Sequence, residues 1–381
     1  MWKRPECSGL PWMVSWQRPE PVSVYEIRKE RQSMGGKILT LADSPVVGIL
    51  ANPASGRDVR RLVARASVFP TVEKSNMILR MLSAMGSLGV RDVLMMPDTG
   101  GIAARVLHEQ ETAIARHGRN WPRVRFLEMP IEYGEIDTIR AVEQMVSQGV
   151  ELIIVMGGDG THRVVSKACG STPLVALSTG TNNTFPEIRE ATVAGLAAGL
   201  VATGKVRVEE VSSQNKLLHL ELGGRGEEIA LVDLCVSTEC WVGTRALWQP
   251  ACLRELFVTF ASPSSIGLSS IVGYLRPVER WDPFGVRLLL APPGEGRFTL
   301  SVPIAPGLMQ QVGVVEMDEL HPRQVCAIGT GRGTIAFDGE RSVAFTEQDR
   351  PLVRLEMEGP ITIDIDRVMR VAAEGHLFIC D

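Results

Sequence analysis

The residues with the clearest chemistry form a glycine-rich run, GGDGT, at positions 157–161. The run directly follows an apolar stretch, ELIIVM, and directly precedes a helical pattern. Glycines let the backbone adopt angles that are closed to other residues, and they let a ligand approach the amide groups. The N–H groups at the start of a helix favour an anion. The run therefore predicts a phosphate-binding turn between a strand and a helix.

Asp159 is the charged residue of this run. It lies at the carboxyl end of the predicted strand, where ligands bind in open α/β sheets. A carboxylate there repels a phosphate unless a metal ion or a hydroxyl lies between them, so Asp159 would hold Mg²⁺ or accept the proton of a hydroxyl being phosphorylated. The alternative is a structural turn in which Asp159 caps the helix. His162, just after it, either lines the cleft or is an exposed residue of the helix start.

Three further segments carry polar groups that could reach a ligand. Residues 178–185 follow the apolar run LVAL, and their hydroxyls and amides suit hydrogen bonds to a ribose or to phosphates, with a polar β-turn as the alternative. Asp338 and Gly339 by themselves form a good hairpin turn. Asp233 lies in the apolar run ALVDL, where a carboxylate without a partner is costly. A site role for Asp233 therefore competes with a salt-bridged or edge-exposed aspartate.

Alternating strands and helices position the GGDGT run and residues 178–185. Short apolar runs that predict strands alternate with helical patterns, and a last helix follows at 191–202. The strands are expected at 46–50, 92–96, 124–129, 151–156 and 173–177, and the helices at 74–88, 102–116, 136–146 and 164–168. This βαβ order predicts an α/β fold with an open, parallel, doubly wound sheet.

The pattern changes near residue 204. Strands are expected at 206–211, 217–222 and 229–236 without long helices between them, and one helical segment follows at 246–260. Eight short strands then lie between 286 and 365, separated by glycine and proline. The second half is therefore predicted to be β-rich. Residues 1–42, with four prolines and no clear periodicity, are treated as an extension of uncertain order.

Composition excludes several classes of protein. The chain has 381 residues, 45% of them hydrophobic, and a net charge of −4, which gives no electrostatic reason to expect a nucleic-acid partner. No apolar run approaches the roughly 18 residues of a membrane span, and the N-terminus lacks a secretory h-region. The seven cysteines are scattered, without a CxxC pair, so we expect unpaired thiols in a reducing, cytoplasmic compartment.

Four motifs in a fixed order carry a resemblance to known proteins. They are NPASG at 52–56, GGDGT at 157–161, GTNNTF at 180–185 and DGE at 338–340. This order resembles the superfamily of NAD kinases, diacylglycerol kinases and sphingosine kinases. Over about residues 46–370 the chain most resembles the ATP–NAD kinase-like AcoX proteins of acetoin-catabolism operons.

The resemblance implies an active site between an α/β domain and a β-rich domain. It implies a nucleotide-binding α/β domain over 43–203, a β-rich domain over 204–360, and a C-terminal segment, 361–381, that returns to the first domain. It also implies that ATP, with Mg²⁺, donates a phosphoryl group to a hydroxyl of NAD, giving NADP, or of a related small molecule. The alternatives are a lipid kinase of the diacylglycerol type and a non-catalytic nucleotide-binding regulator of acetoin catabolism.

The resemblance also assigns residues. Asp159 and Glu340 are the implied catalytic groups, Glu340 because lipid kinases of this superfamily use an acidic residue there. The residues implied to bind the nucleotide are Asn52, Ser55, Gly56, Gly157, Gly158, Gly160, Thr161, Thr181, Asn182, Asn183, Asp233 and Asp338. One departure is Val232, which stands where typical NAD kinases have asparagine before the acidic residue. Edge strands in the β-rich half favour a homo-oligomer.

Overall fold

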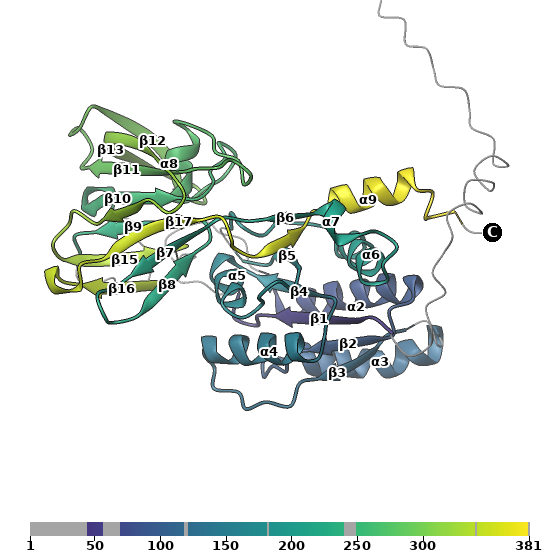
Figure 1. The fold of residues 1–381 in the computed structure, drawn as a ribbon. Helices are drawn as coiled ribbons and strands as arrows, with labels where there is room; N and C mark the ends of the chain where they lie inside the picture. The colour runs from purple at the N-terminus through teal and green to yellow at the C-terminus, as the bar shows by residue number, and fades with distance from the viewer. Residues whose placement is uncertain are drawn as a thin grey trace, which may run out of the picture. The chain divides into compact units, whose positions relative to one another are not determined.

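The computed structural model describes residues 44–55, 69–117, 121–180, 183–239, 249–339 and 341–379. The first sheet has seven strands in the order β3-β2-β1-β4-β5-β18-β6 (Figure 1). Their bounds are β1 Val46–Ala51, β2 Asp92–Met95, β3 Arg123–Phe126, β4 Leu152–Gly157, β5 Leu174–Ser178, β6 Ser212–Gln214 and β18 Ile361–Ile363. Neighbouring strands are parallel except for β6, which runs antiparallel to β18.

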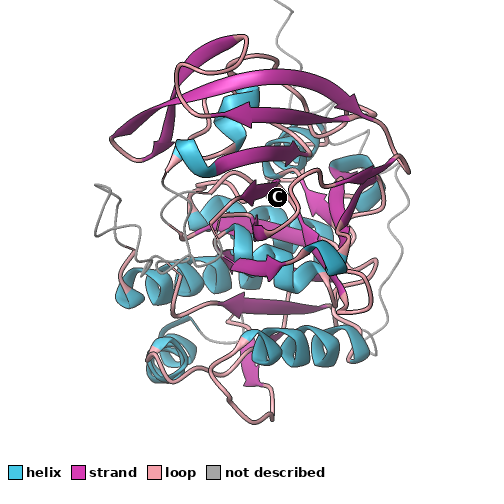
Figure 2. Cartoon of the chain, turned by 90° about the vertical axis from the view of Figure 1, so that its left-hand side faces the viewer, coloured by secondary structure: helices cyan, strands magenta, loops and turns pink. Residues whose placement is uncertain are grey.

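Helices cover both faces of this sheet (Figure 2). They are α2 Thr71–Leu88, α3 Ile102–His117, α4 Glu135–Ser147, α5 Asp159–Ser166, α6 Ala191–Ala202, α7 Val208–Val211 and α9 Ile365–Glu374. In β4, Leu152 and Ile154 pack into the core formed with α2 and α6, whereas Ile153 and Val155 pack into the core formed with α4. Burial on both faces explains why β4 is a continuous apolar run rather than an alternating one.

Helices α2 and α6 approach each other closely at a glycine. A Cβ atom on Gly195 would lie 2.7 Å from the Cα of Met81 and 2.8 Å from its carbonyl oxygen. No side chain fits at that distance from backbone atoms, so glycine allows the two helices to pack with their backbones almost in contact.

Two antiparallel sheets build the second half of the chain. A seven-stranded sheet has the order β12-β13-β11-β10-β9-β15-β16, and a four-stranded sheet has the order β14-β17-β7-β8. Their bounds are β7 Leu217–Glu221, β8 Glu227–Ala230, β9 Asp233–Ser237, β10 Leu253–Val258, β11 Gly285–Ala291, β12 Phe298–Ala305, β13 Leu308–Leu320, β14 Val325–Ala327, β15 Gly333–Phe337, β16 Arg341–Phe345 and β17 Leu352–Glu356, with a short helix α8 at Ser269–Gly273. Side chains of both sheets, among them Leu220, Phe337 and Val353, share one core.

The chain passes between the two halves through two neighbouring segments. Asn215, after β6, donates its backbone N–H to Pro360 O at 3.1 Å, and Gly359 returns a bond to Asn215 O at 2.9 Å. The Asn215 amide also donates to Pro360 O at 2.8 Å and to the Thr362 hydroxyl at 2.9 Å. After this crossing, β18 enters the first sheet between β5 and β6, and α9 packs on α6.

The predicted fold class, a doubly wound α/β half followed by a β-rich half, is confirmed. Two predicted elements were wrong: residues 206–211 end in the helical turn α7 and not in a strand, and the predicted helix over 246–260 contains strand β10. The single strand expected at 229–236 is divided into the end of β8 and the start of β9. The last predicted strand is present as β18 and ends at Ile363, before α9. Within the described part of the chain, no helix has the length and apolarity needed to cross a membrane.

Candidate functional site

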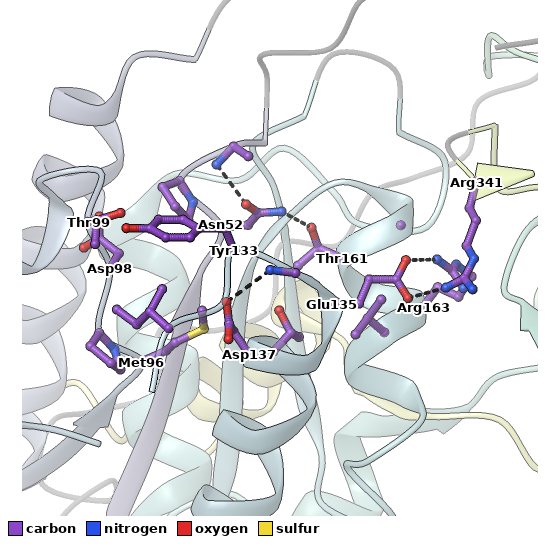
Figure 3. A pocket seen from close by; sticks show the side chains of 18 of the residues that line it. Asn52, Met96, Asp98, Thr99, Tyr133, Glu135, Asp137, Thr161, Arg163 and Arg341 are labelled. Atoms are coloured by element: carbon purple, nitrogen blue, oxygen red, sulfur yellow. Dashed lines mark hydrogen bonds and ion pairs between the residues drawn. The ribbon is translucent and has the colours of Figure 1, made fainter. Parts of the chain in front are cut away.

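A pocket of about 740 Å³ opens at the carboxyl ends of the first sheet's strands (Figure 3). Its wall comprises residues 52–54 after β1, residues 96–99 after β2, and Gly160 and Thr161 at the start of α5. Arg341 and Ser342 of β16 add a contribution from the β-rich half. Strand order reverses between β1 and β4, because β2 and β3 lie on one side of β1 and β5 lies beyond β4. Ligands of open α/β sheets bind at such a switch point.

A side-chain hydrogen bond joins the two loops at this switch point. The Asn52 amide donates to the Thr161 hydroxyl at 2.9 Å, and the Asn52 backbone N–H donates to Met156 O at 3.0 Å. Asn52 also turns its own loop, because its Oδ1 accepts the N–H of Ala54 at 2.8 Å. The predicted site residues Asn52, Gly160 and Thr161 are therefore together in the pocket wall.

Lys74 of α2 fixes the loop after β1 through hydrogen bonds from its side chain. Its ammonium group is fully buried and donates to Asn52 O at 2.8 Å, to Ser55 O at 2.7 Å and to the Ser55 hydroxyl at 2.8 Å. The Ser55 hydroxyl also shares a hydrogen bond of 2.9 Å with Thr179 in the loop after β5. Sequence reasoning missed Lys74; the available signal was a single lysine at the start of an apolar helical pattern.

Three helices begin at the pocket, and they differ in whether a carboxylate accepts backbone N–H groups at or just before their start. Asp98 accepts the N–H groups of Ile102 and Ala103 at the start of α3, and Asp137 of α4 accepts two N–H groups of the preceding turn. Helix α5 follows Gly158, which has no side chain to offer an acceptor. A Cβ atom on Gly157 would lie 2.4 Å from the Cβ of Thr161, so this turn is tight. An uncapped helix start of this kind favours an anionic ligand.

Asp159 lies outside the wall of the pocket. Its buried carboxylate accepts the N–H of Thr184 at 3.1 and 3.0 Å and that of Phe185 at 2.8 Å. The carbonyl groups of the same two residues accept hydrogen bonds from Arg280, whose guanidinium lies 4.8 Å from the centre of the Phe185 ring. The backbone at 184–185 is therefore held between the GGDGT turn and the β-rich half. The catalytic role of Asp159 stays a prediction.

His162 is buried, so the expected exposed position at the helix start was wrong, and it is not among the residues that line the pocket of Figure 3. Its Nδ1 donates to Gly158 O at 2.8 Å, one turn back along α5. Burial, with a smaller contribution from the charge of Arg280, lowers the pKa of His162 from 6.5 to about 4. The ring is therefore neutral at neutral pH, and its position under the turn gives it a structural contact with Phe185, 5.7 Å away between ring centres.

Asp338 and Asp233 lie together in the β-rich half. Asp338 is buried in the turn between β15 and β16, with a positive φ of 48°. Its carboxylate accepts the N–H groups of Leu231, Val232 and Asp233 at 2.8–3.2 Å, and burial raises its pKa. Val232 itself packs against Phe185 in an apolar cluster. The hairpin turn expected at Asp338 is present, and the ligand contacts of Asp338 and Asp233 stay predictions.

Five charged side chains form a network at one end of the pocket. Arg163 of α5 and Arg341 of β16 both contact Glu135, at 2.8 and 2.6 Å. Glu228 of β8 contacts the same two arginines, at 3.4 and 3.0 Å, and Lys167 at 2.6 Å. Sequence reasoning missed this network, because only Arg163 and Lys167, at the two ends of one helical turn, are close in sequence, and the other members come from α4, β8 and β16.

Asn183, another predicted site residue, lies in the loop after β5. Asn183 donates its amide to the Ser178 hydroxyl at 2.7 Å, which closes the loop after β5. Four predicted site residues lie outside the described residues: Gly56, Thr181, Asn182 and Glu340.

Comparison with known proteins covers nearly the whole described chain. The model of the ATP-NAD kinase N-terminal domain matches residues 47–206, and the model of the acetoin catabolism protein X C-terminal domain matches residues 216–358. An acetoin catabolism protein X from Cupriavidus necator is 44% identical over 340 residues, which cover 88% of this chain and 94% of that protein. An NAD kinase from Archaeoglobus fulgidus, solved in complex with ATP, covers 76% of this chain and 100% of its own at 13% identity, with a TM-score of 0.31, a likeness too distant to inform the site. The family suggested by the ordered motifs is thus confirmed, and the chain belongs to the acetoin catabolism protein X family.

Proposed function

We propose that this protein is an ATP-dependent kinase that transfers a phosphoryl group to a hydroxyl of NAD or of a related small molecule. The observation that carries the proposal is the pocket at the switch point between β1 and β4, with the uncapped start of α5 in its wall. A match to the ATP-NAD kinase N-terminal domain over the same strands supports it.

The chemistry needs an in-line transfer. The hydroxyl oxygen of the acceptor attacks the terminal phosphorus of ATP, the bond from that phosphorus to the bridging oxygen of ADP breaks, and the hydroxyl proton passes to a base. Backbone N–H groups at Gly160 and the hydroxyl of Thr161 are the proposed contacts to the phosphates. Asp159 and Glu340 remain the proposed catalytic carboxylates.

The described residues fit ATP better than they fit a protein-held metal ion. No group of three or more His, Cys, Asp or Glu side chains in the described ranges could hold one. Asp98 and Asp137 line the pocket, but each already accepts two backbone N–H groups. Mg²⁺ commonly keeps several waters and binds substrate phosphates with only one or two carboxylates. We therefore propose that Mg²⁺ enters with ATP, and we assign no step to it.

A specific observation favours a second candidate, a non-catalytic regulator that binds a nucleotide. The Asp159 carboxylate is engaged by the N–H groups of Thr184 and Phe185 and does not line the pocket. A protein that only binds a nucleotide needs the pocket and the turn but no base. The lipid-kinase alternative depends on Glu340, which lies outside the described residues.

Product analysis by mass spectrometry separates these candidates. The protein and its Asp159→Asn variant are incubated with MgATP and a panel of NAD, NADH, adenosine, diacylglycerol and small polyols. An NADP product that disappears in the variant supports the NAD kinase proposal. A different phosphorylated product keeps the kinase class and replaces the acceptor. Saturable ATP binding without any product would overturn the kinase proposal in favour of the regulator.

A further inference from the structure

Two arginines from different halves of the chain meet at one wall of the pocket. Arg163 belongs to α5, directly after the GGDGT turn, and Arg341 belongs to β16. Both line the pocket, and both bind the same carboxylate, Glu135, one on each of its oxygens (Figure 3). Glu135 therefore holds the two guanidinium groups side by side.

The network around them holds three cations against nearby carboxylates. Its members in the described residues are Arg163, Lys167 and Arg341, with the carboxylates Glu135 and Glu228. The buried carboxylate of Asp338 also lies within electrostatic reach of Arg163. The charges are therefore close to balanced, and what this wall offers an anionic group of a ligand is two neighbouring guanidinium groups.

Arg163 also carries a donor that the protein does not satisfy. Its side chain is almost completely buried, and its Nε–H has no acceptor among the described residues. Buried donors are normally paired, and each exception calls for an explanation. Arg163 lines the pocket, so the guanidinium group that carries this unsatisfied donor lies beside the space where a ligand would bind.

The rest of the pocket indicates which part of a nucleotide would reach the arginines. Met96, Pro97, Ile131 and Tyr133 supply apolar and aromatic surface to the pocket. In the view of Figure 3, Thr161 lies between Met96 and Tyr133 on one side and the two arginines on the other. A base and ribose packed on the apolar surface would place the first phosphates at Thr161 and the last phosphate at the arginines.

We propose that Arg163 and Arg341 bind the terminal phosphate of a nucleoside triphosphate and so distinguish it from a diphosphate; this rests on the proposed function. Guanidinium groups bind phosphate oxygens through two charge-assisted hydrogen bonds, which a methionine cannot replace and a lysine replaces only in charge. Arg341 has a side chain that is 40% exposed and sits at the pocket, so it can exchange Glu135 for the phosphate without unfolding its strand. The terminal phosphate would then connect the two halves of the chain.

Calorimetric titration with ADP and with a non-hydrolysable ATP analogue tests this. The variants are Arg341→Met, Arg341→Lys and the control Arg354→Met. Arg354 is 37% exposed, pairs with Glu356 at 2.6 Å, and does not line the pocket. We expect Arg341→Met to weaken binding of the ATP analogue by about 10- to 100-fold, with ADP affinity nearly unchanged. Arg341→Lys should fall in between, and the control should alter neither affinity.

The possible results separate the inference from the proposed function. If Arg341→Met weakens the binding of both nucleotides equally, or of neither, the arginine pair does not bind the terminal phosphate selectively. The proposed nucleotide site stands in that case. If the unsubstituted protein binds neither nucleotide, the proposed function fails and the inference fails with it. Thermal unfolding of each variant checks folding, and Arg341→Lys, which retains the charge between Glu135 and Glu228, decides the question if Arg341→Met does not fold.

Discussion

Asn52 and Thr161, 109 residues apart in the chain, share a hydrogen bond of 2.9 Å that joins the loop after β1 to the start of α5. Both residues line the pocket, so this bond fixes the separation of the two loops that would bind phosphates. The geometry of the site thus depends on a contact between two neutral side chains as well as on the glycines of the turn.

Replacing Thr161 with valine should weaken nucleotide binding. Valine keeps the shape of the side chain but removes the acceptor of the Asn52 amide and a donor to the phosphates. We expect ATP affinity to fall by about tenfold and the free energy of unfolding by about 1 kcal/mol. Calorimetry and urea denaturation measure both. Thr203→Val, which removes a hydroxyl bonded to Gly199 O at the end of α6, is the control and should leave affinity unchanged.

Lys74→Met should destabilise the protein strongly. The substitution removes the donor to the carbonyl groups of Asn52 and Ser55; Asn52 O keeps the N–H and hydroxyl of Ser55, whereas the bond to Ser55 O is lost. Because these hydrogen bonds to a charged donor lie inside the protein, we expect a loss of about 3 kcal/mol in the free energy of unfolding, together with weaker nucleotide binding. Denaturant titration beside Lys205→Met, an exposed lysine, measures the difference. Equal stability of the two variants would contradict the role given to Lys74.

The buried His162 predicts a pH dependence of stability. Because burial lowers its pKa from 6.5 to about 4, the unfolded chain binds a proton between these values that the folded chain does not. Stability should therefore fall as the pH drops from about 6.5 to about 4, and this contribution levels off below that range.

His162→Gln removes the titrating group and isolates its contribution. Between pH 7 and pH 5 the unsubstituted protein should lose about 2 kcal/mol more of its free energy of unfolding than the variant does. Urea denaturation at the two pH values measures the difference. Parallel losses in both proteins would show that His162 titrates normally in the folded state.

Gly195→Ala should be destabilising although alanine is the better helix former. The added Cβ would lie 2.7 Å from the Cα of Met81, and the shift of α2 against α6 should cost about 1–3 kcal/mol, more than the gain in helix propensity of about 1 kcal/mol. Gly199→Ala is the matched comparison, because its nearest contact is the flexible end of Leu88, at 2.9 Å. Thermal unfolding should rank Gly195→Ala below Gly199→Ala, and the reverse order would contradict the packing argument.

The α/β half could be read from sequence because each element has its own periodicity. Helix α6 has the predicted bounds, Ala191–Ala202, and β4 was recognised as a strand buried on both faces. Strand β10 could not be read in this way. Its central position buries both faces, and Leu253, Leu256, Phe257 and Phe260 happen to follow helical spacing.

The candidate site was predictable in part. Asn52, Gly160 and Thr161 belong to motifs whose spacing indicates phosphate binding, and all three line the pocket. Arg163 and Arg341 carry no such signal, because their shared partner Glu135 lies 28 and 206 residues away. Contacts of that kind depend on how the elements pack, and packing is not encoded in any local pattern.

The place of β18 in the first sheet has a consequence for biosynthesis. Between β5 and β6, the sheet receives a strand at residues 361–363, after the whole β-rich half has been translated. Until residues 361–363 have been made, the edge of β5 that pairs with β18 lacks that strand, and β6, whose neighbour in the sheet is β18, lacks its partner. The pocket therefore rests on a sheet that stays incomplete until the chain has been translated through β18.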